Sequence, residues 1–248
     1  MKESVVFLGT SHGDPSLTRF CSSTLYRFGD LKILVDCGEP ATALLIRQGI
    51  RPSELDAVFL THMHADHTNG LASLCGQILK YPDRRVEVFF PDPAAIGPFV
   101  NWCRIIVRDD LPDEKLLHLE GIRPLWNKDG ITVRPIPTEH MVPSYALSIE
   151  TPQTRILHTG DLCCDFHDFP LRGDEEPYDL CVCEGTHFRQ HPDRFVETMM
   201  TAPVRKLILN HIGPRWTDGQ ENLLREIAAP LPYPVLIADD GTSVVIHE

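Results

Sequence analysis

The chain has 248 residues, 42% of them hydrophobic and 23% charged, and a formal net charge of -12. This length supports a full-sized core, and we expect residues 1–248 to form one α/β domain. No apolar run is long enough to span a membrane and the first residues do not resemble a signal peptide, so we expect a cytoplasmic protein with no membrane partner. The negative charge argues against a protein that grips a phosphate backbone through Lys and Arg, and we expect nucleic acid not to be a partner.

Hydrophobic patterning predicts strands and helices in rough alternation. In the first half, strands are expected at 5–8, 23–28, 32–35, 57–60 and 85–90, and helices at 41–47, 68–79 and 94–107. In the second half, strands are expected at 131–136, 145–150, 155–158, 179–183, 206–209, 235–237 and 243–246, and helices at 192–200 and 217–227. Two halves of mixed sheet with helices outside favour a four-layer α-β-β-α sandwich, although spacing alone leaves other α/β folds open.

A dense group of metal-binding side chains follows one of the buried strands. His62, His64, Asp66 and His67 lie within six consecutive positions. Neutral imidazoles and carboxylates are the ligands that zinc and similar divalent metals prefer. His62 and His64 are two residues apart on an extended segment and can point the same way, while Asp66 and His67 follow on a turn. One short loop can therefore serve two adjacent metals.

Three further candidate ligands lie just beyond predicted strands. His140 follows the strand at 131–136, Asp161 follows the strand at 155–158, and His211 follows the strand at 206–209. Loops gather into sites at strand ends, so we expect these side chains to approach the loop that carries His62.

The ordered set of motifs resembles the metallo-β-lactamase superfamily. The matching motifs are His-x-His-x-Asp-His at 62–67, a lone His at 140, Thr-Gly-Asp at 159–161 and Asn-His at 210–211. The resemblance implies that His62, His64 and His140 hold a first metal, that Asp66, His67 and His211 hold a second, and that Asp161 bridges them. It implies two divalent metal ions, with zinc expected first and manganese or iron as alternatives.

Finer features are similar to the ribonuclease Z branch and its relatives, which include cyclic phosphodiesterases of phosphonate breakdown. They are Phe7–Ser11, Leu34–Glu39, Val142–Ala146 after His140, Glu184–Thr186 and His211–Arg215. The transfer-RNA processors of that branch carry a Gly/Pro-rich basic arm in mid-chain, whereas residues 91–121 have mixed charge and predict a helix plus a loop. Relatives in the branch are often dimers, so a homodimer is expected as one option.

The resemblance implies a dinuclear metal-dependent phosphodiesterase. A hydroxide that bridges the metals would attack phosphorus, and the expected substrate is a small, anionic, cyclic or nucleotide-like phosphodiester. The alternatives are a lactone, β-lactam or thioester hydrolase with the same site, and an inactive metal-dependent binding or sensor protein. Substrate class depends on pocket walls that the sequence does not show.

The catalytic candidates are Asp66 and three groups expected near the rim of the site, namely His12, Glu184 and His187. Three groups could give the leaving group its proton: His187, which Glu184 would orient, His12, and Glu184 itself. The alternative for each rim group is an ordinary loop or supporting role.

Several other polar residues are weighed against structural roles. Asp36 is expected to support the metal-binding histidines, or to form a turn before Gly38. His158, within a strand, is expected to be half-buried and hydrogen-bonded. Arg215 is expected to pair with a substrate anion or to form a surface salt bridge.

The 8 cysteines are expected to be reduced thiols, because a chain of this length needs no disulfide framework. Cys181 and Cys183 share one face of a strand, and we expect small buried hydrophobic side chains there. Cys163 and Cys164 lie beside Asp161, where a thiol could add a ligand or be oxidised, and we favour packing.

Overall fold

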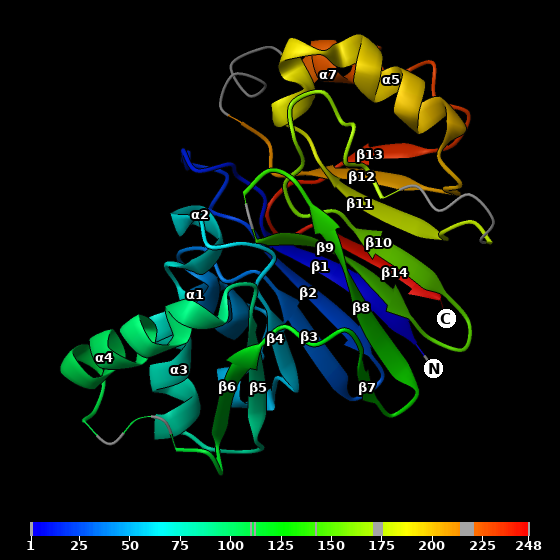
Figure 1. Ribbon diagram of the computed structural model, residues 1–248. Helices are drawn as coiled ribbons and strands as arrows, with labels where there is room; N and C mark the ends of the chain where they lie inside the picture. Colours follow the sequence, from blue (N-terminus) through cyan, green and yellow to red (C-terminus); the bar gives the residue numbers. More distant parts are fainter. Residues whose placement is uncertain are drawn as a thin grey trace.

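The computed structural model describes residues 2–109, 111, 113–141, 143–170, 176–213 and 221–247. Two seven-stranded sheets lie face to face, and helices cover the outer face of each (Figure 1). The predicted four-layer α-β-β-α sandwich is confirmed. None of the helices in these ranges is both long enough and apolar enough to cross a membrane.

The first sheet has the strand order β14-β1-β2-β3-β4-β5-β6. Its strands are β1 (Glu3–Gly9), β2 (Ser23–Phe28), β3 (Leu31–Val35), β4 (Ala57–Phe59), β5 (Val86–Phe90), β6 (Leu117–Gly121) and β14 (Ser243–His247). The pairs from β14 to β3 are antiparallel, and those from β3 to β6 are parallel. Strand β6 was not predicted.

The second sheet has the order β13-β12-β11-β10-β9-β8-β7. Its strands are β7 (Trp126–Lys128), β8 (Ile131–Thr138), β9 (Ser144–Glu150), β10 (Arg155–His158), β11 (Leu180–Glu184), β12 (Leu207–Asn210) and β13 (Val235–Ile237). Strands β10 to β13 are parallel, and the remaining pairs are antiparallel. Strand β7 was not predicted either.

The helices lie outside the two sheets, apart from the short helix α2 at their common edge (Figure 1). On the first sheet lie α1 (Ala41–Arg47), η1 (Pro52–Glu54), α3 (Leu71–Lys80), η2 (Pro93–Ala95) and α4 (Ile96–Ile106); α2 is Ala65–Thr68. On the second lie η3 (His187–Gln190), α5 (Pro192–Thr201) and α7 (Glu221–Ala228). Residues 217–220 of the last predicted helix lie outside the described residues. The stretch between β5 and β6 forms η2 and α4, as the sequence predicted.

The helix expected at 68–79 is in fact two helices, α2 and α3, with a break at Asn69 and Gly70. A β-carbon on Gly70 would lie 2.8 Å from the carbonyl oxygens of both Cys37 and Gly38. The chain therefore passes directly against the backbone that follows β3, and only glycine fits this close approach. The break leaves α2 as a separate short helix that carries Asp66 and His67.

The core has one central layer between the sheets and one layer under each set of helices. In strand β1, successive side chains point to opposite faces of the sheet and pack in two different core layers. Val5 and Phe7 belong to the central layer, whereas Val6 and Leu8 pack in the layer under α1 and α3. In the central layer the rings of Phe59 and Phe89 stack with centroids 4.6 Å apart.

One polar contact crosses the central layer and joins the two sheets. The hydroxyl of Tyr26, on β2, lies 2.9 Å from Nδ1 of His158, on β10, and both side chains are buried. His158 is thus hydrogen-bonded as expected, but it is fully rather than half buried. Burial lowers the pKa of His158 to about 4.

This buried histidine should make the metal-free protein sensitive to mild acid. Below pH 6.5 the unfolded chain protonates His158 while the folded chain does not, so stability is lost as the pH falls from about 6.5 to about 4. Between pH 7.5 and 5 this loss should be about 2 kcal/mol. Urea unfolding of the wild type and of His158→Gln at both pH values measures it. The variant should lose distinctly less stability over this interval, and equal losses would contradict this role of His158.

Candidate metal centre

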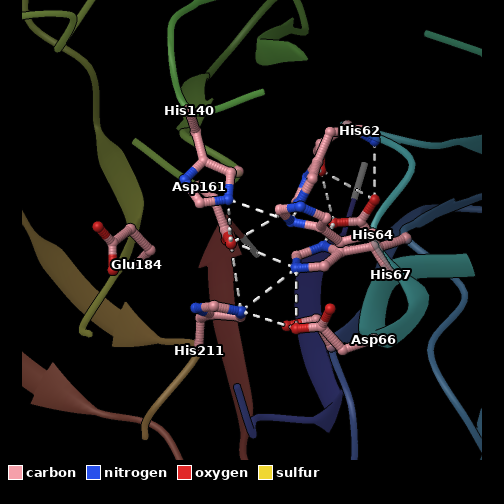
Figure 2. Close-up of polar contacts among 12 residues, drawn as sticks. His62, His64, Asp66, His67, His140, Asp161, Glu184 and His211 are labelled. Atoms are coloured by element: carbon pink, nitrogen blue, oxygen red, sulfur yellow. Dashed lines mark hydrogen bonds and ion pairs between the residues drawn. The ribbon is translucent and has the colours of Figure 1, made fainter. Parts of the chain in front are cut away.

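The predicted ligands come together at one edge of the sandwich, where the parallel strands of both sheets end (Figure 2). His62 and His64 follow β4, Asp66 and His67 lie on α2, His140 follows β8, Asp161 follows β10 and His211 follows β12. The segments that follow β4, β8, β10 and β12 thus place all of these polar side chains in one region.

Asp36 holds the two ends of the ligand loop together. Its Oδ1 accepts a 2.8 Å hydrogen bond from the Thr61 backbone, and the Thr61 hydroxyl also donates to this carboxylate. Its Oδ2 lies 2.7 Å from Nδ1 of His67. This contact leaves Nε2 of His67 facing the centre, which is how carboxylates orient metal-binding histidines. The supporting role expected for Asp36 is consistent with these contacts.

A close backbone contact fixes the position of α2. A β-carbon on Gly38 would lie 2.2 Å from the carbonyl oxygen of Asp66, so no larger residue fits. Asp36 and His211 both have left-handed backbone conformations, with φ of 60° and 54°. A non-glycine residue in this region costs roughly 1–3 kcal/mol, which the surrounding contacts must offset.

The first cluster of ligand atoms is formed by His62, His64, His140 and Asp161. Nε2 of His62 lies 2.9 Å and Nε2 of His140 lies 3.2 Å from Nδ1 of His64. Oδ2 of Asp161 lies 3.7 Å from Nε2 of His62 and 3.6 Å from Nε2 of His140. Three imidazole nitrogens and one carboxylate oxygen thus surround one point.

The second cluster is formed by Asp66, His67 and His211. Nε2 of His211 lies 3.2 Å from both Nε2 of His67 and Oδ2 of Asp66. Asp161 reaches this cluster too, with Oδ1 3.5 Å from Nε2 of His67 and Oδ2 3.4 Å from Nε2 of His211. Its carboxylate therefore lies between the two clusters.

The donor set fits divalent cations. Three pairs of imidazole nitrogens face each other, one at 2.9 Å and two at 3.2 Å, and each neutral ring has only one N–H to share. Oδ1 of Asp161 is buried and finds no hydrogen-bond partner among the described residues, although buried polar atoms are nearly always paired. Lone pairs directed at a common point and an unpartnered carboxylate oxygen are what a cation would satisfy.

The pKa values of the ligands agree with this fit. Burial by itself raises the pKa of Asp161, but the imidazoles of His211 and His67 outweigh it and hold the pKa well below its usual range. Burial, with His67 nearby, lowers the pKa of His62 to about 3. Burial lowers the pKa of His67 as well, but Asp161 and Asp36 outweigh it and raise the pKa well above the ordinary value. A cation would take the place of the proton on His67.

The three rim candidates lie beside the two clusters, and the ring centroid of His187 is 4.5 Å from that of His140 and 5.6 Å from that of His211. Nδ1 of His187 is 3.4 Å from Oε1 of Glu184 and 3.9 Å from Oδ2 of Asp161. Oε2 of Glu184 accepts hydrogen bonds from the backbone N–H groups of Thr186 and His187, which fixes this buried carboxylate. The ring of His12 lies 5.2 Å from that of His211 and 5.9 Å from that of His187, centroid to centroid.

The cysteines partly follow the expectations. All are free thiols, and Cys181 and Cys183 are buried in the apolar layer of the second sheet, as predicted. The packing role expected for the Cys163–Cys164 pair is wrong. Cys164 is exposed, and Sγ of Cys163 contacts carboxylates and an imidazole, because the loop after Asp161 turns back on itself. Arg215 lies outside the described residues.

Two comparisons report known proteins whose sequences are similar to this chain. A protein-family model described as "Anti-Pycsar protein Apyc1" matches residues 3–96. Ribonuclease Z of Mycobacterium sp. (strain KMS) is 29% identical in an alignment of 276 positions, which covers 98% of this chain and 96% of that protein.

Solved structures agree on the fold. The metallo-β-lactamase fold protein YhfI from Bacillus subtilis superposes with a TM-score of 0.79 at 22% identity, covering 99% of this chain and 100% of that one. Human tRNase Z, short form, superposes with a TM-score of 0.72 at 21% identity, with the same coverage of both chains.

These similarities overturn one expectation. We expected nucleic acid not to be a partner, and this is wrong as an exclusion, because the relatives that match over almost the whole chain include ribonuclease Z. The net charge of -12 is a sum over the chain. It does not measure the charge at a site where bound cations can face a phosphate.

Proposed function

We propose that this chain, a ribonuclease Z-like hydrolase of the metallo-β-lactamase superfamily, cleaves phosphodiester bonds at a two-metal centre. His62, His64 and His140 would hold one metal, Asp66, His67 and His211 the other, and Asp161 would contact both. The observation that carries the proposal is the Asp161 carboxylate, buried between the two clusters with imidazole nitrogens of His62, His140, His67 and His211 within 3.7 Å of it.

The chemistry expected of such a centre is well defined. Two divalent cations bound side by side supply an activated water molecule and neutralise charge on the phosphate oxygens. Zinc fits the histidine-rich donor set, and manganese or iron are alternatives. The protein's part is to hold the ligands rigidly. Asp36 fixes His67 and the start of the ligand loop, and the contact at Gly38 fixes α2.

His187 is the group best placed to give a proton to the leaving oxygen. Its ring lies between Glu184 and Asp161, so it faces both the rim and the centre. Glu184 is buried and fixed by two backbone N–H groups, so it orients the imidazole. His12 contacts the rings of His211 and His187, and it is the weaker candidate because no ion pair joins it to Asp161 within the described residues.

Two substrate classes follow from different observations. The transfer-RNA processors of the ribonuclease Z branch carry a Gly/Pro-rich basic arm in mid-chain, whereas the described residues between β5 and β6 form η2 and α4 against the first sheet. This difference supports a small cyclic or nucleotide-like phosphodiester. RNA is the second candidate, and the similarity to ribonuclease Z over 98% of the chain favours it.

The function is tested with purified protein loaded with zinc, manganese or iron. The substrates are cyclic and linear nucleotide phosphodiesters, a transfer-RNA precursor, a lactone and a thioester. We expect turnover of at least one phosphodiester. Turnover confined to the lactone or thioester, or none with any metal, would contradict the proposal.

Asp161→Asn should lower the metal content and reduce phosphodiester turnover by at least about 100-fold, because a neutral amide balances less of the charge of two cations. Metal analysis and turnover are measured on the same preparations. The control is Asp30→Asn, which changes an exposed carboxylate in the turn between β2 and β3 and should leave both unchanged. An Asp161→Asn protein with full metal content and full activity would sink the two-metal centre.

His187→Gln should slow cleavage of substrates with alkoxide leaving groups by roughly 100-fold or more. It should affect p-nitrophenyl phosphodiesters far less, since p-nitrophenolate leaves without a proton. Glu184→Gln should show the same selectivity in weaker form. His191→Gln, at an exposed position beyond η3, is the matched control and should change neither rate. Equal losses on both kinds of substrate would rule out proton donation by His187.

A further inference from the structure

A separate group of metal-binding side chains lies on the loop that follows Asp161. Sγ of Cys163 is 3.1 Å from Oδ1 of Asp165, 3.0 Å from Nδ1 of His167 and 2.8 Å from Oδ1 of Asp168. Nδ1 of His167 is 2.5 Å from Oδ1 of Asp165. The thiol, the imidazole and the Asp165 carboxylate thus form a group that could hold a metal ion, and the Asp168 carboxylate contacts the same thiol.

The buried side chain of Phe166 determines how this loop places its polar side chains. Phe166 has a left-handed backbone, with φ of 59°, and its side chain is buried against Phe188 and Phe195. With Phe166 pointing inward, its neighbours Asp165 and His167 both extend outward and meet Cys163.

The donor set suits zinc. Cysteine, histidine and carboxylate are its common protein ligands, and a structural site takes four of them in a tetrahedron. Bonds of about 2.0–2.3 Å place ligand atoms of one zinc ion roughly 3.2–3.8 Å apart. The observed contacts, at 2.5–3.1 Å, are about 0.1–0.7 Å shorter than the lower end of this range, so side-chain rotations would have to open the space for an ion.

Two further contacts favour a cation here. Nε2 of His167 lies 3.0 Å from Oε2 of Glu139, the arrangement in which a carboxylate orients a metal-binding histidine. Among the described residues, His167 is the ion-pair partner of both Asp165 and Glu139, and the carboxylate of Asp168 adds more negative charge. A divalent cation would balance this group.

The cluster also joins two loops of the main centre. The carboxylate of Asp168 accepts hydrogen bonds from the backbone N–H of Cys163 and from that of Glu139. Glu139 precedes His140, and Cys163 comes two residues after Asp161. An ion bound by this loop would therefore brace the segments that position both residues.

We propose that Cys163, Asp165, His167 and Asp168 form a third metal site, for zinc, distinct from the ligand clusters on either side of Asp161. Glu139 is a positioning residue for His167. The site binds a structural ion that ties the loop after β10 to the loop after β8.

Cobalt(II) substitution tests the site directly, because cobalt bound to a thiolate absorbs in the near ultraviolet and the proposed main centre offers only nitrogen and oxygen ligands. Metal-free full-length protein is titrated with cobalt(II) while absorbance and bound metal are measured. The wild type should develop the thiolate band. Cys163→Ser and His167→Ala should each bind one equivalent less, and the band should disappear in Cys163→Ser.

The matched control is Cys164→Ser, which removes the exposed neighbouring thiol and should keep both the band and the metal content. Asp161→Asn should also keep the band, which separates this site from the main centre. Circular dichroism verifies that each variant is folded. A wild-type protein without the band, a band that survives in Cys163→Ser, or one lost in Cys164→Ser would overturn the third site.

Discussion

The burial of one carboxylate, Asp161, among imidazoles is the constraint on which the architecture of the site depends. An ionised carboxylate is costly to bury unless charged or hydrogen-bonding groups surround it. Imidazole nitrogens of His62, His67, His140 and His211 lie within 3.7 Å of it, and they come from three segments, which follow β4 of one sheet and β8 and β12 of the other. Only a fold that ends its parallel strands at one common edge delivers them together. The sandwich is therefore the frame that makes this electrostatic arrangement possible.

Most strands could be predicted because they are short apolar runs that end in a polar residue. The run before His211 is an example, since β12 and its pairing partner β11 are both buried throughout. Strands β6 and β7 were missed because they have weak signals of their own and exist through pairing with β5 and β8. The break at Gly70 depends on backbone contact with Cys37, and the return of β14 to the first sheet depends on pairing across most of the chain. Such contacts leave no local pattern.

The same division holds for the site. The order and spacing of histidines and aspartates predicted which residues would meet, and the structure brings all seven together. Sequence reasoning missed the environment of Cys163, because it depends on the left-handed turn at Phe166 and on aromatic packing beneath it. It also treated net charge as evidence against nucleic acid. Charge summed over a surface says little about a buried edge where cations, imidazoles and carboxylates set the local field.

Anomalous X-ray scattering from crystals of the metal-loaded protein is the most direct measurement, because it locates metals without assuming any activity. Two peaks are predicted at this centre, one among His62, His64 and His140 and one among Asp66, His67 and His211, each within bonding distance of the Asp161 carboxylate. Soaking with zinc and then with manganese would show which metal each position accepts. An absence of metal between these ligands at saturating concentration would contradict the two-metal centre.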